Sequence, residues 1–546
     1  MSKRKRRQRP SAKRSQRAPG TRARPAPRRR VRPAAWVIGA VLYGLAWPLS
    51  ADVNLSFLAW FAFVPLFIEL ERHDTFWPFA GRALGFMTLA TLIYCWWWFF
   101  AVPARVLWMT WIGGAQEILL ETTPLLLLYA LRKKLPYQHA LWALVFVWPL
   151  WEWLYNKWEL SMGYLLLANA QAGNIWLIQY VDLFGVWAVT GWVVLFNVLL
   201  YGAFKKYNKR FPSAFWKRTL VIAVLMVGLP GMYGLYRALT LEADDEILVT
   251  MAYTDFDPIQ ETPGEAFRRL ERVVHLTDST AYYAKRRADL YVWPEGALPF
   301  SWDVSNSRRF IYDAVNDWQT PLLAGQIGHR VSASGDTTLS NRAVLVPVEG
   351  DSLKRLHEYV KRRFVPFYEG LPYYRYVQAI PAIRAFHEKK NYLMPGDAAT
   401  LLPLVTRQGR TLQLGTPICH EQQFPTLWTD WTTQGADLFV HLSFESWFGD
   451  RTFQNHFLNI TRLRAIENRR SIARSSNGGP TVFIDAFGRT TRQSRRSEGT
   501  ITTSVKIYTG TPLYARYPNL FVFLCLLGLL VLGISYAKTT RRGRGA

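Results

Sequence analysis

The chain has 546 residues, a formal net charge of +27 and 50% hydrophobic residues. Its mean hydropathy of only −0.01 excludes a chain that is apolar throughout, so the apolar residues must gather in part of it. They gather in 34–239 and 517–538, whereas 240–516 has the composition of a soluble domain, and the length allows several domains.

The first 33 residues form a basic segment with 15 Lys or Arg and no acid. Such a segment cannot bury enough apolar surface to fold, so it is predicted to be disordered. A nucleic-acid-binding arm is one interpretation of a basic run. Because an apolar stretch follows at once, a cytoplasmic flank that orients an uncleaved first anchor, with contact to anionic lipids as an addition, is favoured. No nucleic-acid partner is therefore expected.

Long apolar runs predict membrane-spanning helices, which need about 20 residues each. The candidates are 34–51, 55–71, 77–102, 107–131, 139–158, 179–204, 219–239 and 517–538. The pattern predicts seven spans, a large polar insertion and one last span. The aromatic run 95–100 predicts either an interfacial belt or a packed helix face.

The basic residues orient these spans. The predicted loops on the side of the N-terminus are 72–76, 132–138, 205–218 and the C-terminal tail, and their basic clusters lie at 132–134, 205–206, 209–210, 217–218 and 541–544. The opposite loops, with Arg105 as their one basic residue, are 52–54, 103–106 and 159–178. Since cytoplasmic loops carry such an excess of positive charge, both termini are expected in the cytoplasm. The polar insertion is then expected outside it, which in a bacterium means the periplasm or the cell exterior.

Short β-type runs alternate with helical stretches through the polar insertion. The strand candidates are 247–252, 289–293, 320–326, 343–346, 412–418 and 436–442, and the helix candidates are 264–287, 306–319 and 454–470. This alternation predicts an α/β domain.

Three chemically complementary residues lie where an α/β domain places a site. Glu295 follows the strand candidate 289–293, Cys419 ends the candidate 412–418, and Lys361 follows a predicted loop. Cys419 has no partner for a disulfide, because the other two cysteines of the chain lie in apolar runs. Taken singly, Glu295 and Lys361 are more often solvated charges, and a lone cysteine is more often a small buried hydrophobe.

Together the three residues suffice for acyl transfer without a metal or cofactor. A thiol with a pKa of about 8.5 is mostly protonated at neutral pH, and a nearby carboxylate can remove its proton during attack. The attacked carbonyl becomes an oxyanion, which an ammonium group can stabilise. The pattern therefore favours a cysteine nucleophile with a base and a cation.

Several short motifs, taken in order, resemble a known family. They are Trp293-Pro294-Glu295, Lys361 with Phe364-Val365-Pro366-Phe367 and Glu369, Ile418-Cys419-His420-Glu421, Trp447-Phe448-Gly449-Asp450 and Arg474-Ser475-Ser476-Asn477. These segments resemble the carbon–nitrogen hydrolase (nitrilase) superfamily, and with the membrane framework the chain looks like the bacterial apolipoprotein N-acyltransferases. The implied fold is an α-helical membrane bundle of about eight spans plus an α/β nitrilase-like α-β-β-α sandwich.

The resemblance also implies domains and a location. The expected parts are a cytoplasmic tail 1–33, a bundle 34–239, an external catalytic domain 240–516, a last span 517–538 and a cytoplasmic tail 539–546. The protein would lie in the bacterial inner membrane with a periplasmic catalytic domain.

By the same resemblance, each site residue has a role. Glu295 would be the general base, Lys361 the oxyanion stabiliser and Cys419 the nucleophile, with Glu369 and Glu421 supporting them. The thiolate would take an acyl chain from a membrane phospholipid, and the amine of a diacylglyceryl-cysteine in an apolipoprotein would accept it. The segment 364–395 would form either an apolar arm over the acyl chain or an ordinary packed loop.

Some residues depart from the family pattern. His420 replaces the usual Tyr after the nucleophile, 253–257 replaces a Gln-x-Asn segment, and Phe444-Glu445 replaces Asn-Asp. A metal site at Cys419 is disfavoured, because adjacent strand residues point to opposite faces and no metal-binding spacing is present. A membrane-tethered amidase or other amine acyltransferase, and a non-catalytic scaffold, remain as alternatives.

Overall fold

The computed structural model describes residues 35–49, 53–100, 107–207, 213–256, 263–300, 308–331, 337–348, 356–448, 450–494 and 498–544. The basic segment 1–33, with its expected disorder and role in orientation, lies outside these residues. The chain divides into two units, Met1–Pro33 and Ala34–Ala546, and all described helices and strands belong to the second unit.

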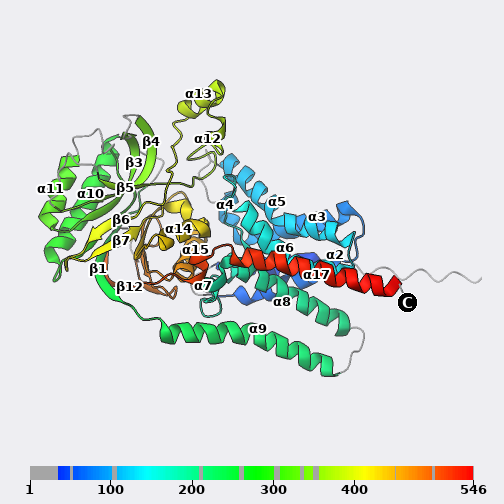
Figure 1. The fold of residues 1–546 in the computed structure, drawn as a ribbon. Helices are drawn as coiled ribbons and strands as arrows, with labels where there is room; N and C mark the ends of the chain where they lie inside the picture. The colour runs from blue at the N-terminus through cyan, green and yellow to red at the C-terminus, as the bar shows by residue number, and fades with distance from the viewer. Residues whose placement is uncertain are drawn as a thin grey trace, which may run out of the picture. The chain divides into compact units, whose positions relative to one another are not determined.

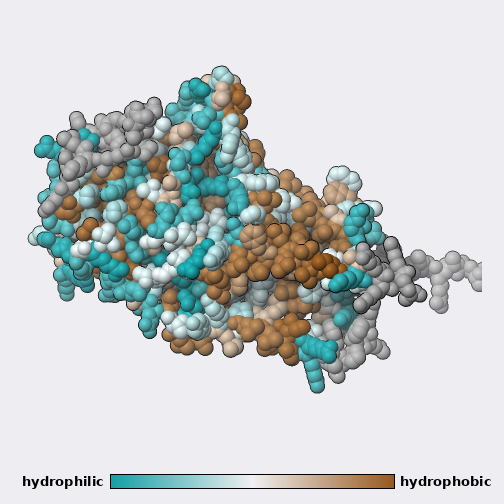
Figure 2. All heavy atoms as spheres, in the orientation of Figure 1, coloured by the Kyte–Doolittle hydropathy of each residue, from teal (hydrophilic) through white to brown (hydrophobic). Residues whose placement is uncertain are grey.

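Apolar helices make up the first part of the described chain (Figure 1). They are α1 (Ala35–Leu45), α2 (Ala59–Leu70), α3 (Phe76–Tyr94), α4 (Trp96–Phe100), α5 (Leu107–Arg132), α6 (Tyr137–Tyr155), α7 (Val181–Phe184), α8 (Val186–Tyr207) and α9 (Ser213–Thr240). The last helix, α17 (Leu520–Arg544), returns to them and packs Gly528 against Phe146 of α6. Figure 2 shows hydrophobic residues gathered over α17 and the helices beside it, and hydrophilic residues over the strand-bearing part. An apolar surface of this extent is suited to lipid rather than to water.

Four of the described helices are long and apolar enough to cross a membrane: Phe76–Tyr94, Val186–Lys206, Lys217–Thr240 and Leu520–Thr539. The prediction of eight spans is therefore supported for four of them. The helices α1 and α2 have 11 and 12 residues and rise only about 17–18 Å, less than the ~30 Å of a hydrocarbon core. In α5 and α6, the buried carboxyl groups of Glu117, Glu121 and Glu152 interrupt the apolar sequence.

The predicted span 179–204 is broken at Gly185, which separates α7 from α8. Gly185 has φ +71, and a Cβ there would lie 2.3 Å from the ring of Tyr514. Beside this break, Arg469 pairs with Asp182 at 2.8 Å and donates to the Gln179 side chain at 2.6 Å, and these contacts are buried. The break therefore allows the helical part to dock closely on the strand-bearing part.

The strand-bearing part contains two six-stranded sheets. The first has the order β12-β1-β2-β3-β4-β5, with β1 (Asp245–Tyr253), β2 (Leu290–Leu298), β3 (Leu322–Val331), β4 (Thr337–Val346), β5 (His357–Val360) and β12 (Gly499–Ile507). The second has the order β11-β10-β9-β8-β7-β6, with β6 (Leu402–Val405), β7 (Thr411–Gly415), β8 (Leu438–Phe444), β9 (Ile472–Asn477), β10 (Val482–Ile484) and β11 (Thr490–Gln493). Parallel pairing joins β1 to β2 and β2 to β3, and likewise β7 to β8 and β8 to β9.

Alternation along β2 shows how the layers form. Leu290 and Val292 join a core with strands of the second sheet, whereas Tyr291 and Trp293 join a core with the helices α10 (Pro263–Tyr283) and α11 (Arg308–Trp318). On the second sheet, Trp428 of α14 (Pro425–Thr433) packs against Phe439 of β8 at 4.8 Å between ring centroids. Because successive strand residues face opposite sides, the result is an α-β-β-α sandwich, as expected from the sequence.

The expected strands and helices of this part are all present, but several boundaries differ: β4 begins at Thr337 rather than at 343, and β7 ends at Gly415 rather than at 418. The strands β6 and β9 to β12 were not among the expected ones. Glu295 lies inside β2 rather than after it, because the polar motif continues the strand beyond the apolar run. Lys361 directly follows the four-residue strand β5, which the sequence analysis assigned largely to a loop. The remaining helices are α12 (Tyr374–Val377), α13 (Pro381–Lys389), α15 (Arg451–Asn468) and α16 (Leu513–Arg516).

Candidate active site

Cys419 lies at a sharp turn after β7. Ile418 forms a bridge with Leu442 of β8, and Cys419 then opens a short 3₁₀ turn, Cys419–Gln423, with φ +47. Non-glycine residues rarely adopt this left-handed conformation, and where they do it often marks a functional position. The Sγ atom lies 3.9 Å from the carbonyl oxygen of Phe444. The turn therefore presents the thiol at the end of the parallel strands.

Lys361 and Glu295 form a buried pair with Glu369. The Nζ atom of Lys361 lies 3.3 Å from Oε1 of Glu295 and 2.6 Å from Oε1 of Glu369. Asn341 donates from Nδ2 to Oε1 of Glu295 at 2.6 Å. The Lys361 side chain is 0% exposed and that of Glu295 4%. Glu295 of β2 and Asn341 of β4 thus meet Lys361, which follows β5, and Glu369 in one hydrogen-bonded cluster.

The second oxygen of Glu295 takes no part in these contacts. Among the described residues, Oε2 of Glu295 is buried without a hydrogen-bond partner. The thiol of Cys419 lies near enough to the Glu295 carboxyl group to lower its pKa. An acceptor oxygen beside a thiol has the placement that a general base requires.

Burial sets the protonation states of these groups. Burial raises the pKa of the Cys419 thiol above its ordinary value, Glu295 adds to the rise, and Lys361 opposes it. Burial likewise raises the pKa of Glu295, while Lys361 acts in the lowering direction. For Lys361, burial lowers the pKa, but Glu295 and Glu369 outweigh it and raise the pKa. The site therefore holds a neutral thiol and a charged lysine, and attack by sulfur needs a base during the reaction.

Glu421 joins the nucleophile turn to the segment after Lys361. Its Oε2 accepts from the backbone of Ile418 at 2.8 Å, and its Oε1 accepts from the hydroxyl of Tyr359 at 2.6 Å and from the backbone of Arg362 at 2.7 Å. Burial raises the pKa of Glu421, and these hydrogen bonds act in the opposite direction. The carboxyl group therefore fixes the distance between the two loops.

Glu421→Ala is expected to destabilise the protein by about 3 kcal/mol, because the Tyr359 hydroxyl and the backbone amides of Ile418, Arg362 and Arg363 lose their acceptor. Tyr359→Phe removes one of these partners and should cost about 1 kcal/mol. Thermal unfolding of both variants in detergent measures the difference. Equal stability of Glu421→Ala and the parent protein would contradict this account of the two loops.

A cavity of about 830 Å³ adjoins the thiol. Glu295, Glu369 and Cys419 line it, together with apolar residues from the helical part, namely Trp97, Trp98, Met109, Met162 and Tyr164. Lys361 is fully buried and is not among the lining residues. From the segment 364–395, Val365, Pro366, Tyr368, Asn391 and Leu393 also face the cavity. That segment thus forms part of the wall.

The aromatic residues of the helical part were not predicted as site residues. Trp97 is buried and meets Phe448 at 5.1 Å and Phe453 at 4.8 Å between ring centroids. For Trp97 and Trp98 this supports the interpretation of 95–100 as a packed helix face. The aromatic run itself was the available signal, but only the fold brings it beside Cys419.

Two buried carboxyl groups hold the segment that completes this wall. Oε1 of Glu117 accepts from the backbone of Met162 at 3.0 Å, and Oε1 of Glu152 accepts from the backbone of Leu167 at 2.8 Å. Met162 and Tyr164 line the cavity. Acidic residues inside the helical part therefore position the wall that faces the thiol.

His420, the departure from the family pattern, also lines the cavity. It is 1% exposed, and burial, followed by Lys361 and Arg363, lowers its pKa to about 3. Its ring packs against Tyr164 and Phe424. A neutral imidazole with aromatic neighbours can replace a tyrosine ring at this place.

The other departures have structural surroundings. Glu445 is fully buried and pairs with Arg474, and it accepts a hydrogen bond from Ser443 at 2.8 Å. Tyr253 ends β1, and Asp257 lies outside the described residues. His441 places Nε2 3.2 Å from the carbonyl oxygen of Cys419 rather than at its thiol.

Comparisons with known proteins cover both parts of the chain. The model of the apolipoprotein N-acyltransferase N-terminal domain matches residues 39–199, and the carbon–nitrogen hydrolase model matches residues 258–512. An apolipoprotein N-acyltransferase of Chlorobaculum tepidum is 29% identical over 92% of this chain and 96% of its own length. One of Geobacter metallireducens is 26% identical over 91% of this chain and 93% of its own.

Among solved structures, a nitrilase-superfamily protein of Saccharomyces cerevisiae covers 49% of this chain and 91% of its own, at 17% identity and a TM-score of 0.35. The two family models follow one another along the chain in the order of its helical and strand-bearing parts. The relatives match over almost their full length. The chain therefore belongs to the apolipoprotein N-acyltransferase family, whose strand-bearing part is a carbon–nitrogen hydrolase domain.

Proposed function

We propose that this protein transfers an acyl chain from a membrane phospholipid, through a thioester on Cys419, to the N-terminal amine of the diacylglyceryl-cysteine of apolipoproteins. The observation that carries the proposal is the cavity in which Glu295 and the Cys419 thiol meet apolar walls from both parts of the chain. A cavity with apolar walls beside an acylatable thiol is suited to a lipid acyl chain. Family membership supports the acceptor.

The first half-reaction forms the thioester. Glu295 takes the thiol proton while Sγ of Cys419 attacks the ester carbonyl carbon of the phospholipid. The charge of Lys361 stabilises the negative oxygen of the tetrahedral intermediate. The carbon–oxygen bond of the ester then breaks, and the leaving lysophospholipid oxygen takes the proton from Glu295.

The second half-reaction returns the thiol. The neutral amine of the acceptor attacks the thioester carbonyl, and Glu295 accepts the amine proton. The carbon–sulfur bond breaks, the amide forms, and the proton passes to the Cys419 sulfur. This scheme uses no cofactor. Each proton that leaves one group is received by another group of the site or by the leaving group.

The membrane arrangement is part of the proposal. Eight spans, with the domain boundaries at 33/34, 239/240, 516/517 and 538/539, would place both termini in the cytoplasm and the catalytic domain in the periplasm. Basic loops on one side of the helices support this orientation. Both substrates are anchored in the membrane, so the thiol must open towards its outer surface.

The orientation can be tested at Thr337, an exposed residue at the start of β4. A Thr337→Cys variant should react with a membrane-impermeant maleimide in intact cells of a host with a permeable outer membrane. The parent protein, with Cys95 and Cys525 buried and Cys419 recessed in its cavity, provides the control. Reaction only after lysis would place the domain on the cytoplasmic side.

The function itself is tested by mass spectrometry of the purified protein after incubation with a phospholipid. An acyl mass on the Cys419 peptide is expected, and a diacylated lipopeptide added afterwards should remove it and gain an N-acyl group. Release of free fatty acid without acylated lipopeptide would favour a membrane-tethered amidase or hydrolase. An unmodified Cys419 peptide with no product would favour a non-catalytic scaffold.

The rate of thioester formation is expected to depend on the ionisation of Glu295. Because burial raises the pKa of this base, kcat/KM for the donor should rise with pH through a midpoint above the ordinary glutamate value of about 4.3. The reaction with the donor is stopped at set times at several pH values between acidic and neutral, and the amount of acyl-Cys419 peptide gives the rate at each pH. Glu295→Gln should lower the rate by about 10²–10⁴-fold and remove this acid limb. An unchanged limb in that variant would assign the titration to another group.

A further inference from the structure

Strand β8 holds the turn that carries Cys419 by three contacts. Leu442 donates from its backbone to the carbonyl oxygen of Pro417 at 3.2 Å. The carbonyl oxygen of Phe444 lies 3.9 Å from Sγ of Cys419. The side chain of His441 places Nε2 3.2 Å from the carbonyl oxygen of Cys419. The strand therefore contacts the chain before the nucleophile, the thiol itself and the peptide that follows it.

The contact from His441 is a hydrogen bond in which the ring is the donor. A carbonyl oxygen only accepts, so Nε2 carries the hydrogen. Burial, followed by the charge of Arg474, lowers the pKa of His441 well below its ordinary value, and a neutral imidazole carries a hydrogen on one nitrogen only. Nδ1 is buried without a hydrogen-bond partner among the described residues. The one N–H group of this ring is therefore directed at the nucleophile turn.

The carbonyl group that accepts this hydrogen bond belongs to a strained residue. Cys419 has φ +47, a left-handed conformation that costs free energy in a non-glycine residue and persists only where the surroundings enforce it. The direction of its carbonyl group follows its ψ angle, so a hydrogen bond to the carbonyl oxygen restricts that angle. Ile418, on the other side, forms a bridge with Leu442. With both sides of Cys419 bonded to β8, the direction of its Cα–Cβ bond is set.

Packing alone does not require a histidine at this position. The His441 side chain is 0% exposed and lies beside Trp428, with 5.9 Å between the ring centroids. An apolar side chain could fill the same space without leaving a buried nitrogen unpaired, which costs free energy. What the imidazole adds to packing is its hydrogen bond to Cys419.

We propose that His441 is a positioning residue for the nucleophile, whose Nε2–H group holds the carbonyl group of Cys419 so that Sγ keeps its place at the cavity wall. His441 is not among the described residues that line the cavity, so it acts through Cys419 and not on the substrate. The inference rests on the proposed function, because the rate that it concerns is the rate of thioester formation.

His441→Met and His441→Gln together test this role. The two new side chains have nearly the same length, but only glutamine carries an N–H donor at its end. His441→Met should lower kcat of thioester formation by about tenfold, because the thiol loses its alignment. KM for the phospholipid should stay within about twofold, since the cavity walls are unchanged. His441→Gln should recover most of the rate. The amount of acyl-Cys419 peptide at several phospholipid concentrations gives both constants.

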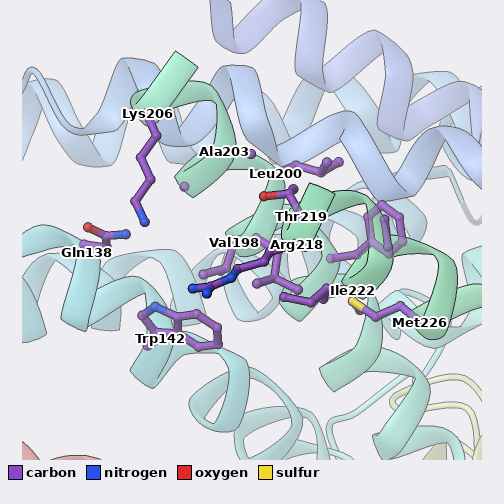
Figure 3. Close-up of a pocket in the computed structure, with 14 residues that line it drawn as sticks. Gln138, Trp142, Val198, Leu200, Ala203, Lys206, Arg218, Thr219, Ile222 and Met226 are labelled. Atoms are coloured by element: carbon purple, nitrogen blue, oxygen red, sulfur yellow. The ribbon is translucent and has the colours of Figure 1, made fainter. Parts of the chain in front are cut away.

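A second cavity provides the control for stability. It has a volume of about 290 Å³, lies between α6, α8 and α9 (Figure 3), and shares no lining residue with the cavity beside Cys419. Phe196 lines it and is buried, so Phe196→Leu should lower the unfolding temperature and leave kcat unchanged. An equal fall of kcat in Phe196→Leu and His441→Met would show that the rate follows stability, and the proposal would be overturned.

The comparison of the two His441 variants decides the proposal. Equal rates in them, whether both low or both like that of the parent, would refute it, because the N–H donor would then make no difference. Failure of the proposed function is seen separately, as the absence of acyl-Cys419 in the parent protein. Alkylation of Cys419 by iodoacetamide then gives the readout. It should be slower in His441→Met than in His441→Gln, and equal alkylation of the two would again refute the role of His441.

Discussion

Replacing Cys419 with alanine is expected to abolish acyl transfer, with no acyl group on the corresponding peptide. The proposed mechanism forms its acyl bond on this thiol, and the variant leaves Glu295 and Lys361 without a group to activate. Cys419→Ser should retain little activity, because a hydroxyl is far harder to ionise than a thiol. Acylation of a diacylated lipopeptide by the purified variants measures both effects.

The loss of acyl transfer supports the mechanism only if the Cys419 variants remain folded. Cys419→Ala removes one sulfur atom at the edge of a cavity and should leave thermal stability within about 1 kcal/mol of the parent. The positive φ of Cys419 is equally strained with either side chain. Normal N-acylation by a folded Cys419→Ala protein would end the thioester mechanism.

Lys361→Met is expected to lower the rate of thioester formation by at least 10²–10³-fold, about 2.7–4 kcal/mol of barrier, because the oxyanion loses its cation. The Lys361→Met substitution should lower the rate by more than the loss of one hydrogen-bond donor to the oxyanion would. Lys361 lies between the carboxyl groups of Glu295 and Glu369, and because burial already raises the pKa of Glu295, this group favours its protonated form once Lys361 is gone. Glu295 would then be lost as a base.

Measurements of stability distinguish the loss of the oxyanion's cation from the loss of the ion pairs that Lys361 makes. Removing one partner of a buried ion pair costs about 3–5 kcal/mol, so Lys361→Met alone should unfold at a lower temperature than the parent. The double variant Lys361→Met/Glu369→Gln removes one of the unpaired carboxylates and should recover part of the stability. Its activity should stay low, since the cation is still absent. Recovery of the rate together with the stability would make Lys361 a structural residue only.

Sequence patterns predicted the strand-bearing part well, because two local signals agree there. Apolar runs of strand length alternate with amphipathic helices, and each run is buried on both sides, as in β2 and β8. The helical part was predicted less well. Of the eight predicted spans, the length and composition of the described helices support four, and the spans at α1, α2, α5 and α6 stay predictions.

The sequence by itself determined the chemistry that the site can offer and the family to which the chain belongs. A lone thiol in the polar part, with Glu295 and Lys361 in short motifs, is a local property that side-chain types and spacing carry. Only the tertiary structure decided how these groups meet. It placed Glu295 within a strand with one oxygen buried and without a hydrogen-bond partner among the described residues, and it set Lys361 between Glu295 and Glu369.

The wall of the cavity is also a result of tertiary structure. Trp97 and Tyr164 reach Cys419 across more than 200 positions of sequence, and Glu117 and Glu152 hold the segment around Tyr164 by hydrogen bonds to its backbone. Such contacts depend on how helices and sheets pack, which no local pattern records. Cys419 could therefore be proposed as the nucleophile from its neighbours in sequence, whereas the surface that would hold an acyl chain could be proposed only from its neighbours in space.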